Sequence, residues 1–75
     1  MLNQVIEIIA DELSVDAANI KEDTRLKEDL NVDSLDVVEL VMRLEETFDV
    51  AVSDEAAAKL ITVKDIVSYI ESQKS

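Results

Sequence analysis

Ser34 is the residue through which this chain could best perform or receive chemistry, because its hydroxyl lies between the carboxylates of Asp33 and Asp36. A catalytic serine needs a base within hydrogen-bond reach and donors for the developing oxyanion. The chain has no His to act as the base and no Gly to form a nucleophile elbow. The two carboxylates would also repel a developing negative charge. The residue types therefore argue against an enzyme with hydrolase chemistry at Ser34.

The same stretch begins like a calcium-binding EF-hand. Asp29, Asn31 and Asp33 alternate as the first ligands of such a loop do. The sixth position of the loop requires Gly and is Ser34 here, and the twelfth requires a bidentate Glu and is Leu40. A dedicated calcium or other metal site is therefore not predicted. Weak divalent-ion binding by clustered carboxylates stays open for Asp29, Asp33, Asp36 and Glu39.

A purely structural interpretation of Ser34 is also available. Asp33 and Ser34 are both good helix N-caps, and Asp36 in the first turn would be stabilised by the helix dipole. A cap lies at a surface corner, where another protein can reach its hydroxyl. The local residues thus leave two possibilities for Ser34, a cap or an attachment point for chemistry supplied from outside.

The composition limits the class of protein. A chain of 75 residues predicts one small domain over 1–75, and without Cys it can form neither a disulfide nor a thiolate metal site. The absence of Gly excludes glycine-rich phosphate loops and argues against tight turns with positive φ. No apolar run approaches about 20 residues, and the N-terminus has no basic region. We therefore expect no membrane span, no signal peptide and a cytoplasmic location.

The charge is large and uneven. Eighteen acidic residues against seven basic ones give a net charge of −11, which argues against nucleic acid and anionic membranes as partners. Residues 28–55 contain ten acidic residues and a single basic one, Arg43, for a net of −9. A charge that served only solubility would be spread along the chain. This charge is concentrated around Ser34, so solubility alone does not explain it.

Hydrophobic periodicity predicts an all-α fold, a small bundle of three main helices plus one short helix, with a long first loop over residues 14–33. The first helix runs to about Leu13, and the last begins at Thr62 with a capping-box-like pair to Asp65 and frays from Ser72. The short helix over 55–59 is capped by Ser53 or Asp54. The expected buried stripes of the first and last helices are Leu2, Val5, Ile6, Ile9 and Leu13, with Ile8 at the margin, and Val63, Ile66, Val67 and Ile70.

The second main helix should begin at Asp33 or Ser34 and end near Asp49. At about 100° per residue, one arc collects its core residues. They are Val37, Leu40, Val41, Leu44 and Phe48. Leu35, Val38 and Met42 fall on the opposite side among acidic residues, where an ordinary surface helix needs no apolar side chains. This outer face therefore predicts a binding surface.

The stretch DSLDVVELVMRLEETFDV resembles the signature of the acyl carrier proteins, specifically the free-standing type of bacterial fatty acid synthesis. The resemblance runs over essentially the whole chain, from VIEIIADELSV through DLNVDSLD to LITVKDIVSYI. A bare Asp-Ser-Leu occurs by chance in many proteins. Its combination with Val38-Glu39-Leu40 and Leu44-Glu45-Glu46 in a short acidic helical chain is a strong match.

The resemblance implies a carrier and not an enzyme. Ser34 matches the serine that a phosphopantetheinyl transferase modifies with phosphopantetheine from coenzyme A, and acyl chains are then carried as thioesters on the new thiol. The recognition helix that basic patches of fatty acid synthesis enzymes bind matches Asp33, Leu35, Asp36, Glu39, Met42, Glu45 and Glu46, to which the outer face adds Val38. The acyl pocket of the family falls at Phe48, Val52, Ala57 and Leu60. A monomer is expected.

Three departures from the family pattern stand out. The family commonly has Gly shortly before the serine, where this chain has Asn31 and Val32, and Pro before the short helix, where it has Ser53. Arg43 brings a positive charge into the recognition helix. The alternative functions are a polyketide, aminoacyl or peptidyl carrier, or an unmodified acidic interaction module with weak divalent-ion binding. Strong net acidity and Val38-Glu39-Leu40 favour the fatty acid carrier.

Overall fold

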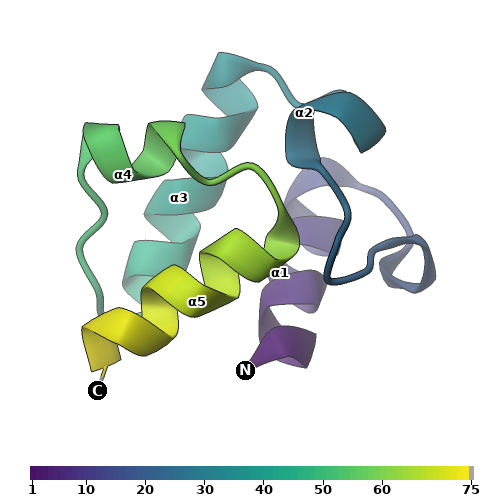
Figure 1. The fold of residues 1–75 in the computed structure, drawn as a ribbon. Coiled ribbons are helices and arrows are strands. Elements are labelled where there is room, and N and C mark those ends of the chain that lie inside the picture. The colour runs from purple at the N-terminus through teal and green to yellow at the C-terminus, as the bar shows by residue number, and fades with distance from the viewer. Residues whose placement is uncertain (75) are drawn as a thin grey trace.

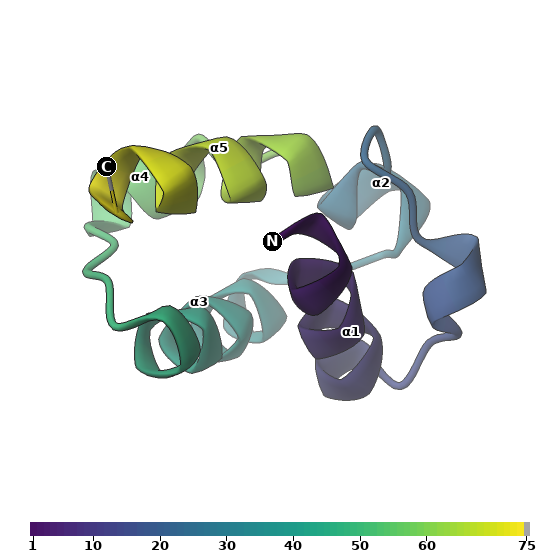
Figure 2. The same ribbon diagram turned by 90° about the horizontal axis from the view of Figure 1, so that it is seen from below.

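A computed structural model describes residues 1–74, and its three long helices surround one hydrophobic core (Figure 1). They are α1 (Leu2–Leu13), α3 (Ser34–Phe48) and α5 (Val63–Lys74). Both α3 and α5 pack against α1. Figure 2 shows α3 and α5 on opposite sides of the molecule. Of the helices in residues 1–74, none is long and apolar enough to cross a membrane. The predicted all-α bundle is confirmed.

The first loop contains more helix than the sequence predicts. It includes a 3-10 turn, η1 (Ala17–Asn19), and a short helix, α2 (Leu26–Asp29), so an uninterrupted loop over residues 14–33 is wrong. Four residues are too few to show a helical period. The helix α2 is held instead by its tertiary setting, since Leu26 is only 2% exposed. The predicted short helix is α4 (Asp54–Ala58), and Ser53 caps it by accepting the Ala56 N–H at 3.1 Å.

The start of α5 is confirmed by its capping box. The Asp65 N–H donates to Thr62 Oγ1 at 3.2 Å, and the Thr62 N–H donates to Asp65 Oδ2 at 3.1 Å. The prediction that the chain frays from Ser72 is wrong for residues 72–74, because α5 continues to Lys74. Ile70, which is 2% exposed, anchors this last part of the helix in the core. The final residue of the predicted frayed tail, Ser75, lies outside the described residues.

Backbone hydrogen bonds tie the first loop to the link between α4 and α5. The Leu26 N–H donates to the Ile61 carbonyl at 2.9 Å, and the Val63 N–H donates to the Thr24 carbonyl at 3.1 Å. Lys64 adds a third bond, from its N–H to the Glu22 carbonyl at 2.8 Å. Residues 22–26 and 61–64 therefore form one connected edge of the fold, although they are distant in the sequence.

The core follows the predicted helix faces, although some of the predicted residues are only partly buried against it, namely Leu2, Ile6, Leu13, Val37 and Val67. The most deeply buried side chains come from all three long helices and from α2. They are Val5, Ile9, Leu26, Leu40, Leu44, Val63, Ile66 and Ile70. Ile8, expected at the margin of α1, is 9% exposed and belongs to the core cluster. It is buried because it lies in the groove between α1 and α3, beside Thr47.

Within residues 1–74, three residues adopt positive φ, although the chain has no Gly. Ser14, Asn31 and Asp49 have φ of 57°, 54° and 54°, so the expectation that such turns are missing is wrong. Ser14 and Asp49 end α1 and α3 as left-handed C-caps, donating their N–H groups to the carbonyls of Ala10 and Glu45. Asn and Asp enter the left-handed region more readily than most residues. Asn31, one of the two residues that stand where the resembling family commonly has Gly, thus adopts a conformation that Gly reaches without steric cost.

Replacing the left-handed serine by glycine should stabilise the fold. A non-Gly residue in the left-handed region costs about 1–2 kcal/mol, and Gly loses about 0.5–1 kcal/mol in extra backbone entropy. We therefore expect Ser14→Gly to raise the free energy of unfolding by about 0.5 kcal/mol in urea denaturation. Ser68→Gly is the matched control, because Ser68 is exposed inside α5, and it should be destabilising. Equal effects of the two substitutions would show that Ser14 stores no strain.

Candidate functional site

Ser34 is the first residue of α3, directly after the residue that caps the helix. That cap is Asp33, whose Oδ1 accepts the Asp36 N–H at 2.9 Å. The Asp36 carboxylate faces the Asp33 N–H at 3.5 Å and completes a capping box. Asp33 and Asp36 therefore perform the structural work at this helix start. Ser34 is not needed as the cap.

The Ser34 hydroxyl is available for chemistry. The side chain is exposed, and within residues 1–74 it forms no hydrogen bond. A serine that is neither capping nor bonded carries no evident structural function. The chain has no His, the residue that most often activates a serine hydroxyl. The arrangement suits a hydroxyl that receives a group.

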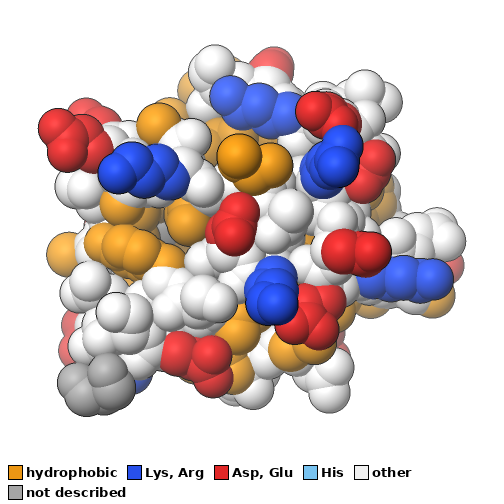
Figure 3. Space-filling model, in the orientation of Figure 1, with side chains coloured by type: hydrophobic (Ala, Val, Ile, Leu, Met, Phe, Trp, Pro, Cys, Tyr) orange, Lys and Arg blue, Asp and Glu red, His pale blue; other side chains and the backbone are white. Residues whose placement is uncertain are grey.

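A cavity of about 440 Å³ opens beside Ser34. It is lined by the first half of α3, by α4, by the segment 25–28 at α2, and by residues 60–61 in the link between α4 and α5. Most of its lining is apolar, with charged residues among it, and Figure 3 shows apolar side chains between acidic and basic ones on this face of the molecule. The apolar lining consists of Val37, Val38, Ala57, Ala58, Leu60 and Ile61.

The cavity includes only half of the predicted acyl pocket. Ala57 and Leu60 line it, but Phe48 and Val52 do not. Phe48 ends α3 at the opposite end from Ser34, and at about 1.5 Å per residue the helix separates them by roughly 21 Å. Phe48 is a core residue with 8% exposure. Sequence reasoning missed Ile61, which is 59% exposed and lines the cavity.

The outer face of α3 has the predicted apolar side chains. Leu35, Val38 and Met42 are 65%, 53% and 54% exposed. Glu39 and Glu46 are exposed as well. Apolar side chains surrounded by carboxylates can contact a partner that is basic at its rim and apolar within. We define the outer face of α3 by these five residues, Leu35, Val38, Glu39, Met42 and Glu46.

Glu45 and Arg43 of α3 are directed away from that face. The Glu45 carboxylate accepts the Val52 N–H at 3.0 Å and holds the loop between α3 and α4, so its predicted recognition role is not supported. Arg43 turns to α1, where Nη1 lies 2.6 Å from Asp11 and 3.6 Å from Glu12. The hydrogen bond with Asp11 raises the pKa of Arg43. The positive charge of Arg43 is thus matched by α1 and leaves the outer face acidic.

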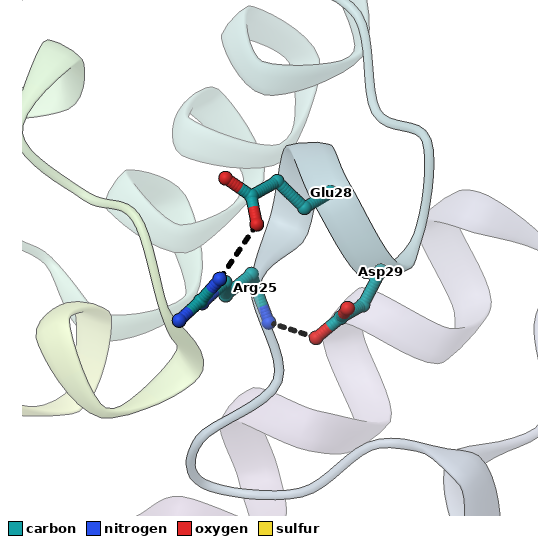
Figure 4. Close-up of polar contacts among 3 residues, drawn as sticks. All are labelled: Arg25, Glu28 and Asp29. Carbon is teal, nitrogen blue, oxygen red and sulfur yellow. Dashed lines mark hydrogen bonds and ion pairs between the residues drawn. The ribbon is translucent and has the colours of Figure 1, made fainter.

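The carboxylates proposed for weak divalent-ion binding are not gathered into a metal site. Within residues 1–74, no three acidic side chains converge in a way that could hold an ion. Asp29 instead accepts the Arg25 backbone N–H at 2.9 Å, at the start of α2 (Figure 4). Asp33 and Asp36 are occupied by the capping box. Their acidity contributes to the surface charge without forming a chelate.

Comparison with known proteins gives a consistent result. Residues 3–70 match the family model described as phosphopantetheine attachment site. The chain is 57% identical over 67 residues to an acyl carrier protein of Helicobacter hepaticus, covering 89% of this chain and 88% of that one. The solved acyl carrier protein of Enterococcus faecalis is 39% identical, with a TM-score of 0.82 over 96% of this chain and 91% of that one.

Proposed function

The chain belongs to the acyl carrier proteins, the family of the phosphopantetheine attachment site, and on this premise we propose that Ser34 is the residue to which the group is attached. The protein carries acyl groups on phosphopantetheine, works with enzyme partners and is not itself an enzyme. The availability of its hydroxyl supports the assignment of Ser34. The hydroxyl is exposed, has no hydrogen-bond partner in residues 1–74, and borders the cavity.

The residues around Ser34 fit a slender attached arm. Val37, Ala57 and Leu60 offer an apolar wall in a cavity of about 440 Å³ that Ser34 itself helps to line. The bound group supplies a terminal thiol for thioester formation, which this Cys-free chain lacks. The chain's own part is to present the Ser34 hydroxyl on a capped helix end and to shelter an apolar cargo from water.

The proposed pathway is fatty acid biosynthesis, with transferase and synthesis enzymes docking through basic patches. The outer face of α3 supports this proposal, because its exposed Glu39 and Glu46 surround Leu35 and Met42. A polyketide, aminoacyl or peptidyl carrier is the alternative. A monomer, a single carrier domain over 1–75 and a cytoplasmic location remain predictions.

Loading tests the attachment directly. The chain is incubated with coenzyme A, Mg²⁺ and a phosphopantetheinyl transferase, and its intact mass is measured. We expect the mass to rise by one phosphopantetheine, and fragmentation to place the group on Ser34. An unchanged mass, or modification of Ser53 or Ser68 instead, would contradict the proposal.

Charge reversal on the outer face of α3 should slow partner binding. In the double variant Glu39→Lys and Glu46→Lys, association with the transferase at low ionic strength is expected to slow by about tenfold or more. The dependence of the rate on salt should weaken as well, because fewer attractive charges remain to be screened. Stopped-flow kinetics across ionic strengths gives both quantities. Folding should be unharmed, because removing like charges relieves repulsion.

The double variant Glu7→Lys and Glu71→Lys is the matched control. Both residues are exposed, on α1 and α5, and the variant has the same net charge as the first. We expect a smaller loss of association rate in the control. Equal losses would mean that net charge alone, and not the outer face of α3, steers the encounter.

A further inference from the structure

The cavity beside Ser34 has two cationic residues in its lining. Arg25 precedes α2 and Lys27 lies within it, and both line the cavity together with Ser34. Their presence contrasts with residues 28–55, which carry a net charge of −9. No pattern in the sequence gave either residue a function. Their position in the same cavity as the proposed attachment residue, Ser34, indicates one.

The Arg25 side chain is positioned by its neighbours but keeps free donors. Nη1 donates to Glu28 Oε2 at 2.7 Å, and within residues 1–74 the guanidinium has no other bonded acceptor (Figure 4). This bond and the charge of Glu28 raise the pKa of Arg25, which as an arginine is cationic at neutral pH in any case. Its remaining N–H groups can donate to another oxyanion. The bridge between Arg25 and Thr62 fixes the backbone that presents it.

Lys27 is the second cation, and it is exposed. Across the part of the chain that the structure describes, its ammonium group pairs with no carboxylate. The acidic residues of the lining are Glu28, which is bonded to Arg25, and Asp54, which lies in the first turn of α4, where the helix dipole favours it. Lys27 is therefore a cation of this cavity without an anion of its own.

Attachment of the arm introduces such an anion at this place. Phosphopantetheine joined to a serine hydroxyl is a phosphodiester and carries one negative charge at neutral pH. At Ser34 this charge would follow Asp33 directly and precede Asp36 by two residues. The N-terminus of α3 favours an anion, but these two carboxylates oppose it. A positive charge elsewhere in the cavity lining would relieve the repulsion.

We propose that Arg25 and Lys27 form an oxyanion subsite that binds the phosphodiester on Ser34 and directs the arm into the cavity. The proposal rests on the proposed attachment at Ser34. A carboxylate at the far end of a dicarboxylic acyl cargo would have the same chemistry. The phosphodiester is the favoured occupant, because it is bonded to a residue of the same cavity lining, whereas the cargo end is a full arm away.

The test compares each protein with and without its arm. The parent, Lys27→Gln, Arg25→Gln and the control Lys59→Gln are prepared unloaded and loaded, with loading verified by intact mass. Lys59 is exposed on the side of α4 away from this cavity. The quantity measured is the melting temperature of the loaded form minus that of the unloaded form. Any general loss of stability, such as that from breaking the Arg25–Glu28 pair, cancels in this difference.

For a domain of this size, we expect loading to change the melting temperature of Lys27→Gln and of Arg25→Gln to a value about 3 °C lower, relative to the unloaded form, than it does in the parent. Lys59→Gln should match the parent, and Arg25→Lys should retain part of the effect because it keeps the charge. High salt should remove the contrast by screening. As a second readout, the ³¹P resonance of the loaded protein should move in Lys27→Gln and not in Lys59→Gln.

The possible failures are distinguishable. A parent that gains no mass overturns the attachment at Ser34 and the subsite with it. If all variants load, show the same change in melting temperature on loading and have the same ³¹P resonance, the subsite alone is overturned. Lys27 is then an ordinary surface lysine. Parallel samples carry a neutral acyl cargo or a dicarboxylic one. A contrast that appears only with the dicarboxylic cargo would overturn the phosphodiester as the occupant and assign the cations to the cargo carboxylate.

Discussion

Ser34→Ala is expected to abolish the attachment of phosphopantetheine while changing the free energy of unfolding by no more than about 0.5 kcal/mol. The loss should be complete, because no other residue supplies a hydroxyl at the head of α3. Stability should persist, because the cap is Asp33 and the Ser34 hydroxyl bonds to nothing in residues 1–74. Ala is also a better helix former than Ser. Intact mass and urea unfolding measure the two effects.

Ser53→Ala is the reciprocal control. Ser53 caps α4 by accepting the Ala56 N–H at 3.1 Å, so its removal should cost about 1 kcal/mol. Loading at Ser34 should remain intact in this variant. One serine is thus expected to affect modification alone and the other stability alone. A loaded Ser34→Ala protein would disprove the site, and an unfolded one would show that Ser34 has a structural role that its contacts do not reveal.

The second large effect concerns the acyl cargo. If the acyl chain enters the cavity, each buried methylene stabilises the loaded protein by about 0.8 kcal/mol. The cost of ordering the acyl chain and of opening the cavity wall reduces this gain. The melting temperature of the loaded protein should therefore rise with acyl length and level off when the cavity is full. Thermal denaturation of a series of acyl forms measures this dependence. Equal melting temperatures for short and medium chains, with the chains solvent-exposed by NMR, would refute an internal location.

Ala57→Phe should flatten that dependence. Ala57 lines the cavity, so the added ring would occupy the space that the cargo needs, while Ser34 stays loadable. Ala56→Phe is the matched control on the same helix, since Ala56 lines the groove toward α5 instead. A difference in absolute stability does not affect the comparison, because the slope against acyl length is measured within each variant. A steep slope in Ala57→Phe would place the cargo elsewhere.

The sequence predicts the parts of this fold that local physics determines. The three long helices follow from apolar residues at helical spacing, and the start of α5 follows from the pair Thr62 and Asp65. Elements that depend on contacts between distant parts of the sequence cannot be predicted in this way. The helix α2 exists because Leu26 is buried and its N–H meets Ile61, and neither fact has a local pattern. The left-handed conformation of Asn31 has no such pattern either, because the absence of Gly points away from it.

The site divides in the same way. Residue types and spacing identify Ser34 and the exposed Leu35, Val38 and Met42, because one helix displays them all. The cavity wall could not be predicted, since it joins α3 to α4 and to the first loop. Glu45 has the chemistry of a recognition residue, yet its bond to Val52 directs it to the loop. A carboxylate's use depends on which backbone N–H the fold brings within reach.

The bonded edge between residues 22–26 and 61–64 gives the cavity one wall that resists local opening and one that does not. Three backbone hydrogen bonds join the two segments of that edge, and Leu26 and Val63 anchor it in the core, whereas α4 is a five-residue helix with no buried side chain. In native-state hydrogen exchange, we therefore expect the amides of the edge to exchange only when the whole protein unfolds, and those of α4 to exchange through a local opening of lower free energy. The cavity can then change its volume through a subglobal fluctuation of α4, at a fraction of the global unfolding free energy. A cargo sheltered in the cavity could then leave through this fluctuation while Ser34 and the outer face of α3 stay folded.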